Sequence, residues 1–226
     1  MPQPDEPLPQ RSWLDDRLAR FAAANDDLVL QTRSLLARVV ADDAQHGRLV
    51  NTLSMLEHMG SRKIMATQHS ANVDQATLRH IAEEAHHAFF MKRQAEKIAG
   101  RPLEYAAQDL LAPATARYYF QRLEAAMKRL LARQRSERAV YLYMSLIVEF
   151  RALWFYGLYQ QALTRARHAM SLKRVIGEER NHLTEMAERL EAAGELSDAR
   201  TDAFVERERT LFARLLTNLQ ASVTAS

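Results

Sequence analysis

The chain of 226 residues contains no cysteine. It therefore cannot form disulfides, thiolate zinc sites, iron–sulfur clusters or a rubredoxin module. Glycine and proline are scarce, with 6 of each, and four of the prolines are Pro2, Pro4, Pro7 and Pro9. Because these residues interrupt helices, their scarcity in the rest of the chain favours long helices over strands and turns. The length suffices for one large helical domain.

Neither sign of charge is in large excess, because the formal net charge is only +3. This value is too small to indicate nucleic-acid binding, although the basic isoelectric point leaves room for acidic partners. Residues 1–10 are rich in proline and lack the apolar core of a signal peptide. They are expected to form a disordered tail, and the protein is expected to be cytoplasmic.

A single apolar run, residues 139–163, is long enough to span a bilayer. Glu149 and Arg151 lie near its centre, and each charge would cost about 2.5–3.5 kcal/mol on insertion scales. We therefore expect no membrane span, but a helix that is buried in the protein and apolar nearly all round. Arg151 is expected either to pair with a carboxylate such as Glu83 or Glu178, or to point outwards.

Apolar periodicity and capping residues predict an all-α fold in one domain, residues 11–226. The core of this domain is expected over residues 28–193, with a C-terminal helix over 198–220. A long segment, residues 101–135, separates two pairs of helices, and a four-helix bundle needs such a crossover when its second and third helices run parallel. The predicted helices cover residues 13–23, 28–67, 75–99, 114–134, 137–165, 172–193 and 198–220.

The sequence Glu-Glu-x-x-His occurs twice, at residues 83–87 and 178–182. Each copy follows a helix that has a carboxylate on its apolar stripe. In the first copy, apolar residues spaced by three and four place Glu84 on the core stripe with His87 beside it, while Glu83 falls next to the stripe. The second copy has the same register. The residues expected to face the core are Glu57, Glu84, His87, Glu149, Glu179 and His182.

Four buried carboxylates would destabilise the fold unless something compensated their charge. An unpaired buried carboxylate costs several kcal/mol or is forced to stay neutral. Metal cations compensate the charge and accept these ligands, and carboxylates with imidazole suit iron or manganese. The pattern therefore predicts a metal site built from the six residues.

This ordered set resembles the ferritin-like di-iron carboxylate superfamily. There, one glutamate from each of two helices joins Glu-x-x-His from each of the other two. The resemblance covers about residues 28–193. It implies a ferritin-like four-helix bundle with a long crossover and extra helices, and it implies two iron ions or a manganese–iron pair. Glu84 and Glu179 would be shared by the metals, Glu57 and Glu149 would be terminal ligands, and each metal would have one histidine.

Within that superfamily, the spacing and size look more like the oxygen-activating members: aldehyde-deformylating oxygenases, fatty-acyl desaturases, small hydroxylases and N-oxygenases. The resemblance thus implies an O2-dependent oxidoreductase acting on a small or carrier-bound, mostly apolar substrate. Electrons would come from an external donor, and the family suggests a homodimer. Two alternatives stay open: a ferroxidase or iron-storage protein, and a non-catalytic helical scaffold with salt-bridged carboxylates.

Several other residues near the predicted site have two interpretations. Gly60 and Ala152, each three residues after a predicted ligand, either leave room for oxygen and substrate or serve helix packing. Tyr156 is expected to be a core tyrosine with a hydrogen-bonded hydroxyl, with a redox role as the alternative. Surface or supporting roles are expected for the remaining histidines considered, which are His46, His58, His69, His80 and His168.

Overall fold

A computed structural model of the chain describes residues 12–68, 73–131 and 137–224. Within these ranges the fold is all-α, as predicted, with one short 3-10 helix, η1, and no strand. The predicted tail, residues 1–10, and the end of the helix predicted to reach residue 134 lie outside the described ranges. The helices are α1 (Trp13–Ala24), α2 (Asp26–Val40), α3 (Asp43–Ala66), α4 (Gln75–Ala99), η1 (Ala107–Asp109), α5 (Pro113–Leu131), α6 (Glu137–Arg165), α7 (Lys173–Ala192) and α8 (Asp198–Thr224).

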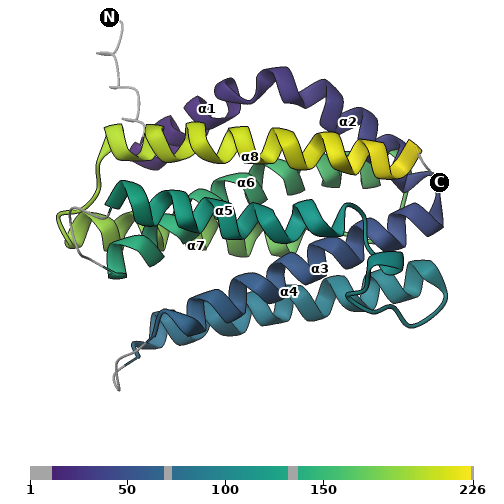
Figure 1. Ribbon diagram of the computed structural model, residues 1–226, viewed down its shortest axis with the longest axis horizontal. Helices are drawn as coiled ribbons and strands as arrows, with labels where there is room; N and C mark the ends of the chain where they lie inside the picture. The colour runs from purple at the N-terminus through teal and green to yellow at the C-terminus, as the bar shows by residue number, and fades with distance from the viewer. Residues whose placement is uncertain (1–11, 69–72, 132–136, 225–226) are drawn as a thin grey trace, which may run out of the picture.

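The prediction of one helix over residues 28–67 is wrong. The chain instead forms α2 and α3, and it changes direction between them (Figure 1). The reason is Asp42, whose side chain accepts hydrogen bonds from the backbone N–H groups of Ala44 and Gln45. An aspartate in this position caps a new helix rather than continuing the old one. The other helices begin and end within a few residues of their predicted bounds.

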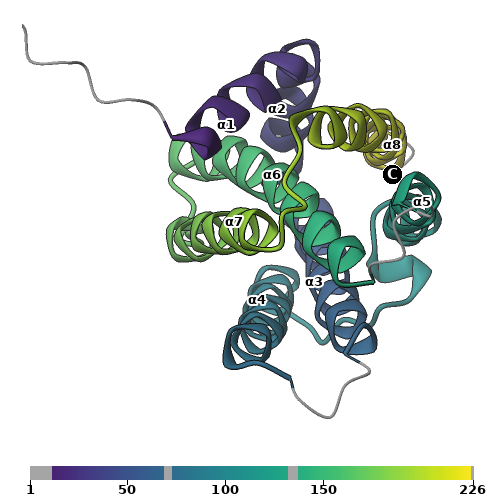
Figure 2. The ribbon, with the colours of Figure 1, turned by 90° about the vertical axis from the view of Figure 1, so that its left-hand side faces the viewer.

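Four helices, α3, α4, α6 and α7, surround the interior that holds the predicted ligands. Helix α3 packs along α4, and α6 packs along α7. Figure 2 looks along these helices and shows the two pairs facing each other. Helices α4 and α6 run in the same direction, and the chain between them passes through η1 and α5 (Figure 1). The predicted crossover thus contains a helix of its own.

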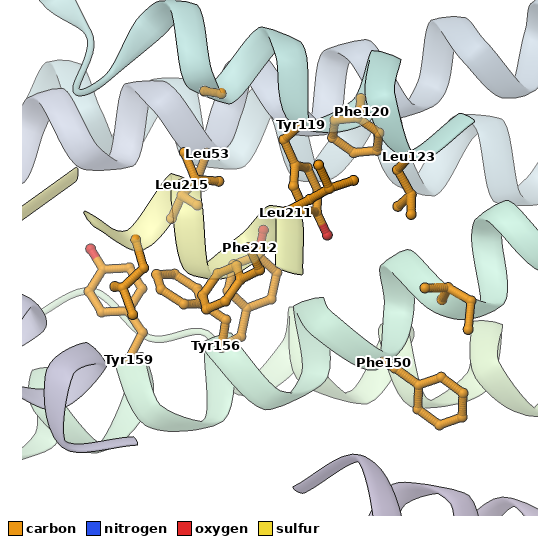
Figure 3. Close-up of a cluster of buried hydrophobic side chains, with 14 of the residues drawn as sticks. Leu53, Tyr119, Phe120, Leu123, Phe150, Tyr156, Tyr159, Leu211, Phe212 and Leu215 are labelled. Carbon is orange, nitrogen blue, oxygen red and sulfur yellow. The ribbon is translucent and has the colours of Figure 1, made fainter. Parts of the chain in front are cut away.

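Helix α6 is long and apolar enough to cross a membrane, but 67% of its most apolar stretch is buried inside the protein. It packs against α2, α5, α7 and α8. This burial is typical of the core helix of a soluble protein, as expected from the charges in its sequence. Figure 3 shows the contact region in which α5, α6 and α8 bring Tyr119, Tyr156 and Phe212 into one apolar cluster.

Arg151 of α6 does not pair with Glu83 or Glu178, and it does not point outwards. It is 5% exposed, and its guanidinium donates hydrogen bonds to both carboxylate oxygens of Glu208 on α8, at 2.9 and 2.8 Å. A further bond reaches the side chain of Asn25 at 2.6 Å. Arg151 therefore pairs with a carboxylate, which was one of the two expectations, but the carboxylate belongs to α8 and not to one of the four helices that surround the site.

Candidate metal centre

All six predicted ligands lie in the interior between α3, α4, α6 and α7. Helix α3 supplies one of them, α4 two, α6 one and α7 two. The register predicted for α4 agrees with the structure, since Glu84 and His87 are buried while His86 is exposed. The exposed fractions of the six are 9% for Glu57, 5% for Glu84, 0% for His87, 4% for Glu149, 0% for Glu179 and 3% for His182.

Two overlapping groups of four residues could each hold a metal ion. Within each group, the ligand atoms all lie within 4.8 Å of one another. The first group is Glu57, Glu84, His87 and Glu179, and the second is His80, Glu84, Glu149 and His182. Glu84 belongs to both groups, which is the arrangement that two neighbouring metal ions with a shared carboxylate require.

His80 is a member of the site that the sequence analysis missed. Its Nε2 atom lies 3.4 Å from Oε1 of Glu149 and 3.5 Å from Oε1 of Glu84, while Nδ1 lies 3.1 Å from the hydroxyl of Tyr141. The signal was present in the sequence. His80 precedes Glu84 by four residues and His87 follows it by three, so all three share one face of α4.

Four buried polar atoms of this cluster have no hydrogen-bond partner among the described residues. They are Nε2 of His80, Oε1 of Glu84, Nδ1 of His87 and Oε1 of Glu179. Buried side-chain polar atoms in proteins nearly always have a partner, so four exceptions in one cluster need an explanation. They lie close together: Nδ1 of His87 is 3.3 Å from Oε1 of Glu179. Cations would satisfy all four atoms, so these residues fit a metal pair.

Two further carboxylates orient the histidines. Nε2 of His87 donates to Glu178 of α7 at 2.9 Å, and Nε2 of His182 donates to Glu83 of α4 at 2.8 Å. Burial acts to raise the pKa of Glu178, but the hydrogen bonds from Arg174 and His87 outweigh burial and lower this pKa. The carboxylate is therefore ionised, and it can only accept hydrogen bonds. Each imidazole therefore presents Nδ1 to the interior, an arrangement typical of histidines that bind metals.

Protons balance the charge of this cluster when no metal is bound. Burial, followed by repulsion from the neighbouring carboxylates, raises the pKa of Glu57 and of Glu149 well above the usual range. Burial acts to lower the pKa of both histidines, but the facing carboxylate of Glu179 outweighs it and raises the pKa of His87 to about 10 and of His182 to about 9. Metal ions would replace these protons.

Tyr156 is buried, and its hydroxyl donates a hydrogen bond to Oε1 of Glu57. This confirms the expectation of a core tyrosine with a hydrogen-bonded hydroxyl. Burial, followed by the charge of Glu57, raises the pKa of Tyr156 well above its usual value, so the hydroxyl keeps its proton. The bond therefore positions one oxygen of Glu57 at the edge of the site.

A cavity of about 550 Å³ reaches the carboxylates of Glu57, Glu84 and Glu149. Gly60 lines it, and a Cβ atom at this position would lie 3.4 Å from Oε2 of Glu84. A smaller space of about 80 Å³, lined by Ala152, touches Glu57 and Glu149 as well. The two small residues singled out in the sequence therefore both border open space beside the carboxylates.

The cluster thus has buried oxygen and nitrogen atoms that could bind metal ions, oriented histidines and access for a small molecule. No protein-family model, curated protein or solved structure matches this chain.

Proposed function

We propose that the chain is a ferritin-like, O2-dependent oxidoreductase whose centre holds two iron ions or a manganese–iron pair. The observation that carries the proposal is the pair of buried ligand groups that overlap at Glu84 and border a cavity. The order of the ligands on α3, α4, α6 and α7, together with the crossover through α5, supports the ferritin-like assignment. A cytoplasmic location is part of the same proposal.

In this proposal Glu57 and His87 hold one metal, and Glu149, His182 and His80 hold the other. Glu84 is shared. Glu179 is suited to sharing as well, because its two oxygens point to different histidines: Oε1 lies 3.3 Å from Nδ1 of His87, and Oε2 lies 3.1 Å from Nδ1 of His182. The set differs from the six-ligand family pattern by the added histidine, His80.

When bound, such a metal pair supplies the reduction of O2 and the oxidation of a substrate. The residues of this chain do the rest. Glu83 and Glu178 fix the imidazole rings, and Tyr156 holds Glu57. The apolar walls of the cavity exclude water from the reacting end of the substrate. Without cysteine the chain has no iron–sulfur cluster to pass electrons, so an external donor supplies them.

The cavity favours an oxidoreductase over a ferroxidase. A ferroxidase needs only a path for iron, whereas about 550 Å³ lies within the range of roughly 300–1,000 Å³ that small organic ligands occupy. The open space beside Glu57, Glu84 and Glu149 counts against a purely structural scaffold, because the packing of a structural core would fill it.

The first test is the amount of iron per chain after loading with excess Fe(II) in air and removing unbound metal. We expect about two ions per chain, as a di-metal centre requires. The variant Glu149→Ala should lose them, while Glu188→Ala, at an exposed position on α7, should keep them. Many ions per chain would indicate storage instead. No binding of iron or manganese would contradict the proposal and leave the scaffold.

If two ions bind, the second test is O2 consumption by the loaded protein with a chemical reductant and candidate substrates. Substrate-dependent consumption supports the oxidoreductase. Consumption that accompanies Fe(II) oxidation alone, with no dependence on any organic molecule, supports the ferroxidase.

A further inference from the structure

The large cavity changes character along its length. Its inner end is formed by the candidate ligands Glu57, Glu84 and Glu149, all at most 9% exposed. Its outer end includes Lys128, whose side chain is 62% exposed. The wall between the two ends is mainly apolar, and it includes Ile64, Phe120, Leu131, Val140, Met144 and Val148. A molecule that fills this space has an apolar body.

Three charged side chains lie together at the outer end. Glu124 of α5 forms ion pairs with Lys63 of α3 and with Lys128 of α5, the latter at 2.6 Å. Burial acts to raise the pKa of Glu124, but the hydrogen bonds from Lys128 and Lys63 outweigh burial and lower this pKa. The carboxylate is therefore ionised. Two lysines and one glutamate leave one positive charge at the outer end of the cavity, beyond its mainly apolar wall.

This charge suits an anion with a single negative charge. Each lysine ammonium has three N–H donors, so the bonds to Glu124 leave donors on both lysines for a second carboxylate. A phosphate monoester would bring about −1.5 to −2 charges and leave an excess beside Glu124. At the inner end the described lining consists of the carboxyl groups of Glu57, Glu84 and Glu149 and has no lysine or arginine to hold the same anion.

We infer that the cavity binds a small amphipathic carboxylate, with its carboxylate group at Lys63 and Lys128 and its apolar chain directed towards the candidate metal centre. The inference rests on the proposed function, and it adds the substrate class and its direction of binding. The end of the apolar chain, remote from the carboxylate, is then the part that reaches Glu57 and Glu149.

The experiment measures binding of decanoate to the purified full-length chain by calorimetry at low ionic strength. Decanamide, which has the same shape without the charge, is the matched ligand, and decyl phosphate tests the other anion. Decanoate should bind about tenfold more tightly than decanamide, a difference that a favourable ion pair supplies. Equal affinity for the two, tighter binding of decyl phosphate, or no binding of either decanoate or decanamide would overturn the inference.

Variants separate recognition of charge from effects on folding. Lys63→Gln and Lys128→Gln should lower the affinity for decanoate about tenfold and leave decanamide unchanged. Glu124→Gln should have the opposite effect, because it removes the competing carboxylate, and decanoate should bind more tightly. Lys97→Gln, at an exposed position on α4 outside the cavity, is the control and should change nothing. Equal losses for both ligands in all three cavity variants would overturn the assignment of the head group.

The direction of binding has its own readout. A decanoate analogue with a photoreactive diazirine at the methyl end should label the inner wall around Gly60 and Val148, as peptide mapping by mass spectrometry will show. Labels around Lys128 or Leu131 would overturn the proposed direction. None of these measurements needs a metal. Failure of the iron test with retained decanoate binding would therefore refute the oxidoreductase and keep the binding site, and the reverse result would refute only the substrate class.

Discussion

Nε2 of His87 on α4 donates a hydrogen bond to Glu178 on α7 at 2.9 Å. The relationship is reciprocal between the two helices, because Nε2 of His182 on α7 donates to Glu83 on α4 at 2.8 Å. Each Glu-Glu-x-x-His segment thus supplies one inward carboxylate, one inward histidine and one outer carboxylate that orients the histidine of the other segment. Each glutamate of the Glu-Glu pair therefore has its own role: the first orients a histidine on the other helix, and the second faces the interior.

Loss of an outer carboxylate should weaken metal binding without abolishing it. Glu178→Gln and Glu83→Gln should each lower the affinity for Fe(II) or Mn(II) about 10–100-fold, as changes behind a metal-binding histidine generally do. Competition with a metal-binding dye measures this affinity. Glu188→Gln on the exposed side of α7 should bind like the wild type. Unchanged affinity in Glu178→Gln and Glu83→Gln would mean that the outer contacts do not orient ligands.

His80 should affect one metal ion more than the other. Because it belongs only to the group of Glu84, Glu149 and His182, His80→Gln should weaken one of two binding steps at least about tenfold and spare the other. A titration that resolves the two steps measures this. His86→Gln is a control on the same helix, since His86 is exposed. Equal weakening of both steps would argue against separate groups.

The metal-free chain should lose stability as the pH rises from 7 to 10. The folded pKa values of His87 and His182, about 10 and about 9, lie above the ordinary value of 6.5. A histidine whose pKa is higher in the folded chain contributes its full stabilisation below pH 6.5, where it is protonated in both states. This contribution is lost as the pH rises through the pKa values of the folded chain. The raised pKa values of Glu57 and Glu149 act in the same direction.

Thermal unfolding across this pH range, with chelator and with saturating metal, measures the effect. The Tm of the metal-free chain should fall and that of the metal-bound chain should change much less, because metal replaces the protons. Metal binding at pH 7 should accordingly release protons into a weakly buffered solution. A metal-free Tm that stays level from pH 7 to 10 would be inconsistent with protonated histidines in the centre.

Glu208→Ala should destabilise the fold and leave the metal centre intact. The carboxylate of Glu208 is fully buried against Arg151, so its removal leaves a buried charge without its main partner. Such a loss costs about 3–5 kcal/mol of unfolding free energy. Urea unfolding measures it, with Glu206→Ala at an exposed position on α8 as the control. A cost no larger than that of the control, or loss of metal from the folded variant, would contradict this separation.

Much of the candidate centre could be predicted because helical geometry alone decides it. Residues three and four apart share a face of a helix, so Glu84 with His87 and Glu179 with His182 had to project together once their segments were helical. The same rule applied one turn earlier would have included His80. The Glu-x-x-His pattern does not include it, because His80 precedes its carboxylate instead of following it.

The break between α2 and α3 was harder to predict. No glycine or proline marks it, and the apolar stripe continues on both sides. Asp42 decides it by capping the first turn of α3, but aspartate also occurs on exposed helix faces, where it caps nothing. Whether the chain forms one helix or two depends on whether two separately packed helices are more stable than one continuous helix. This balance is a property of the whole fold.

The sequence by itself determined the helical class, the inward faces of four helices and the carboxylate and imidazole groups that these faces carry. These features follow from local spacing, and local spacing is set by the rise and turn of the helix. Only the tertiary structure decided which side chains meet across helices. It placed Arg151 against Glu208, oriented His87 on Glu178, and set Lys63 and Lys128 around Glu124. Such contacts depend on how distant segments pack, and no repeat along the chain encodes that.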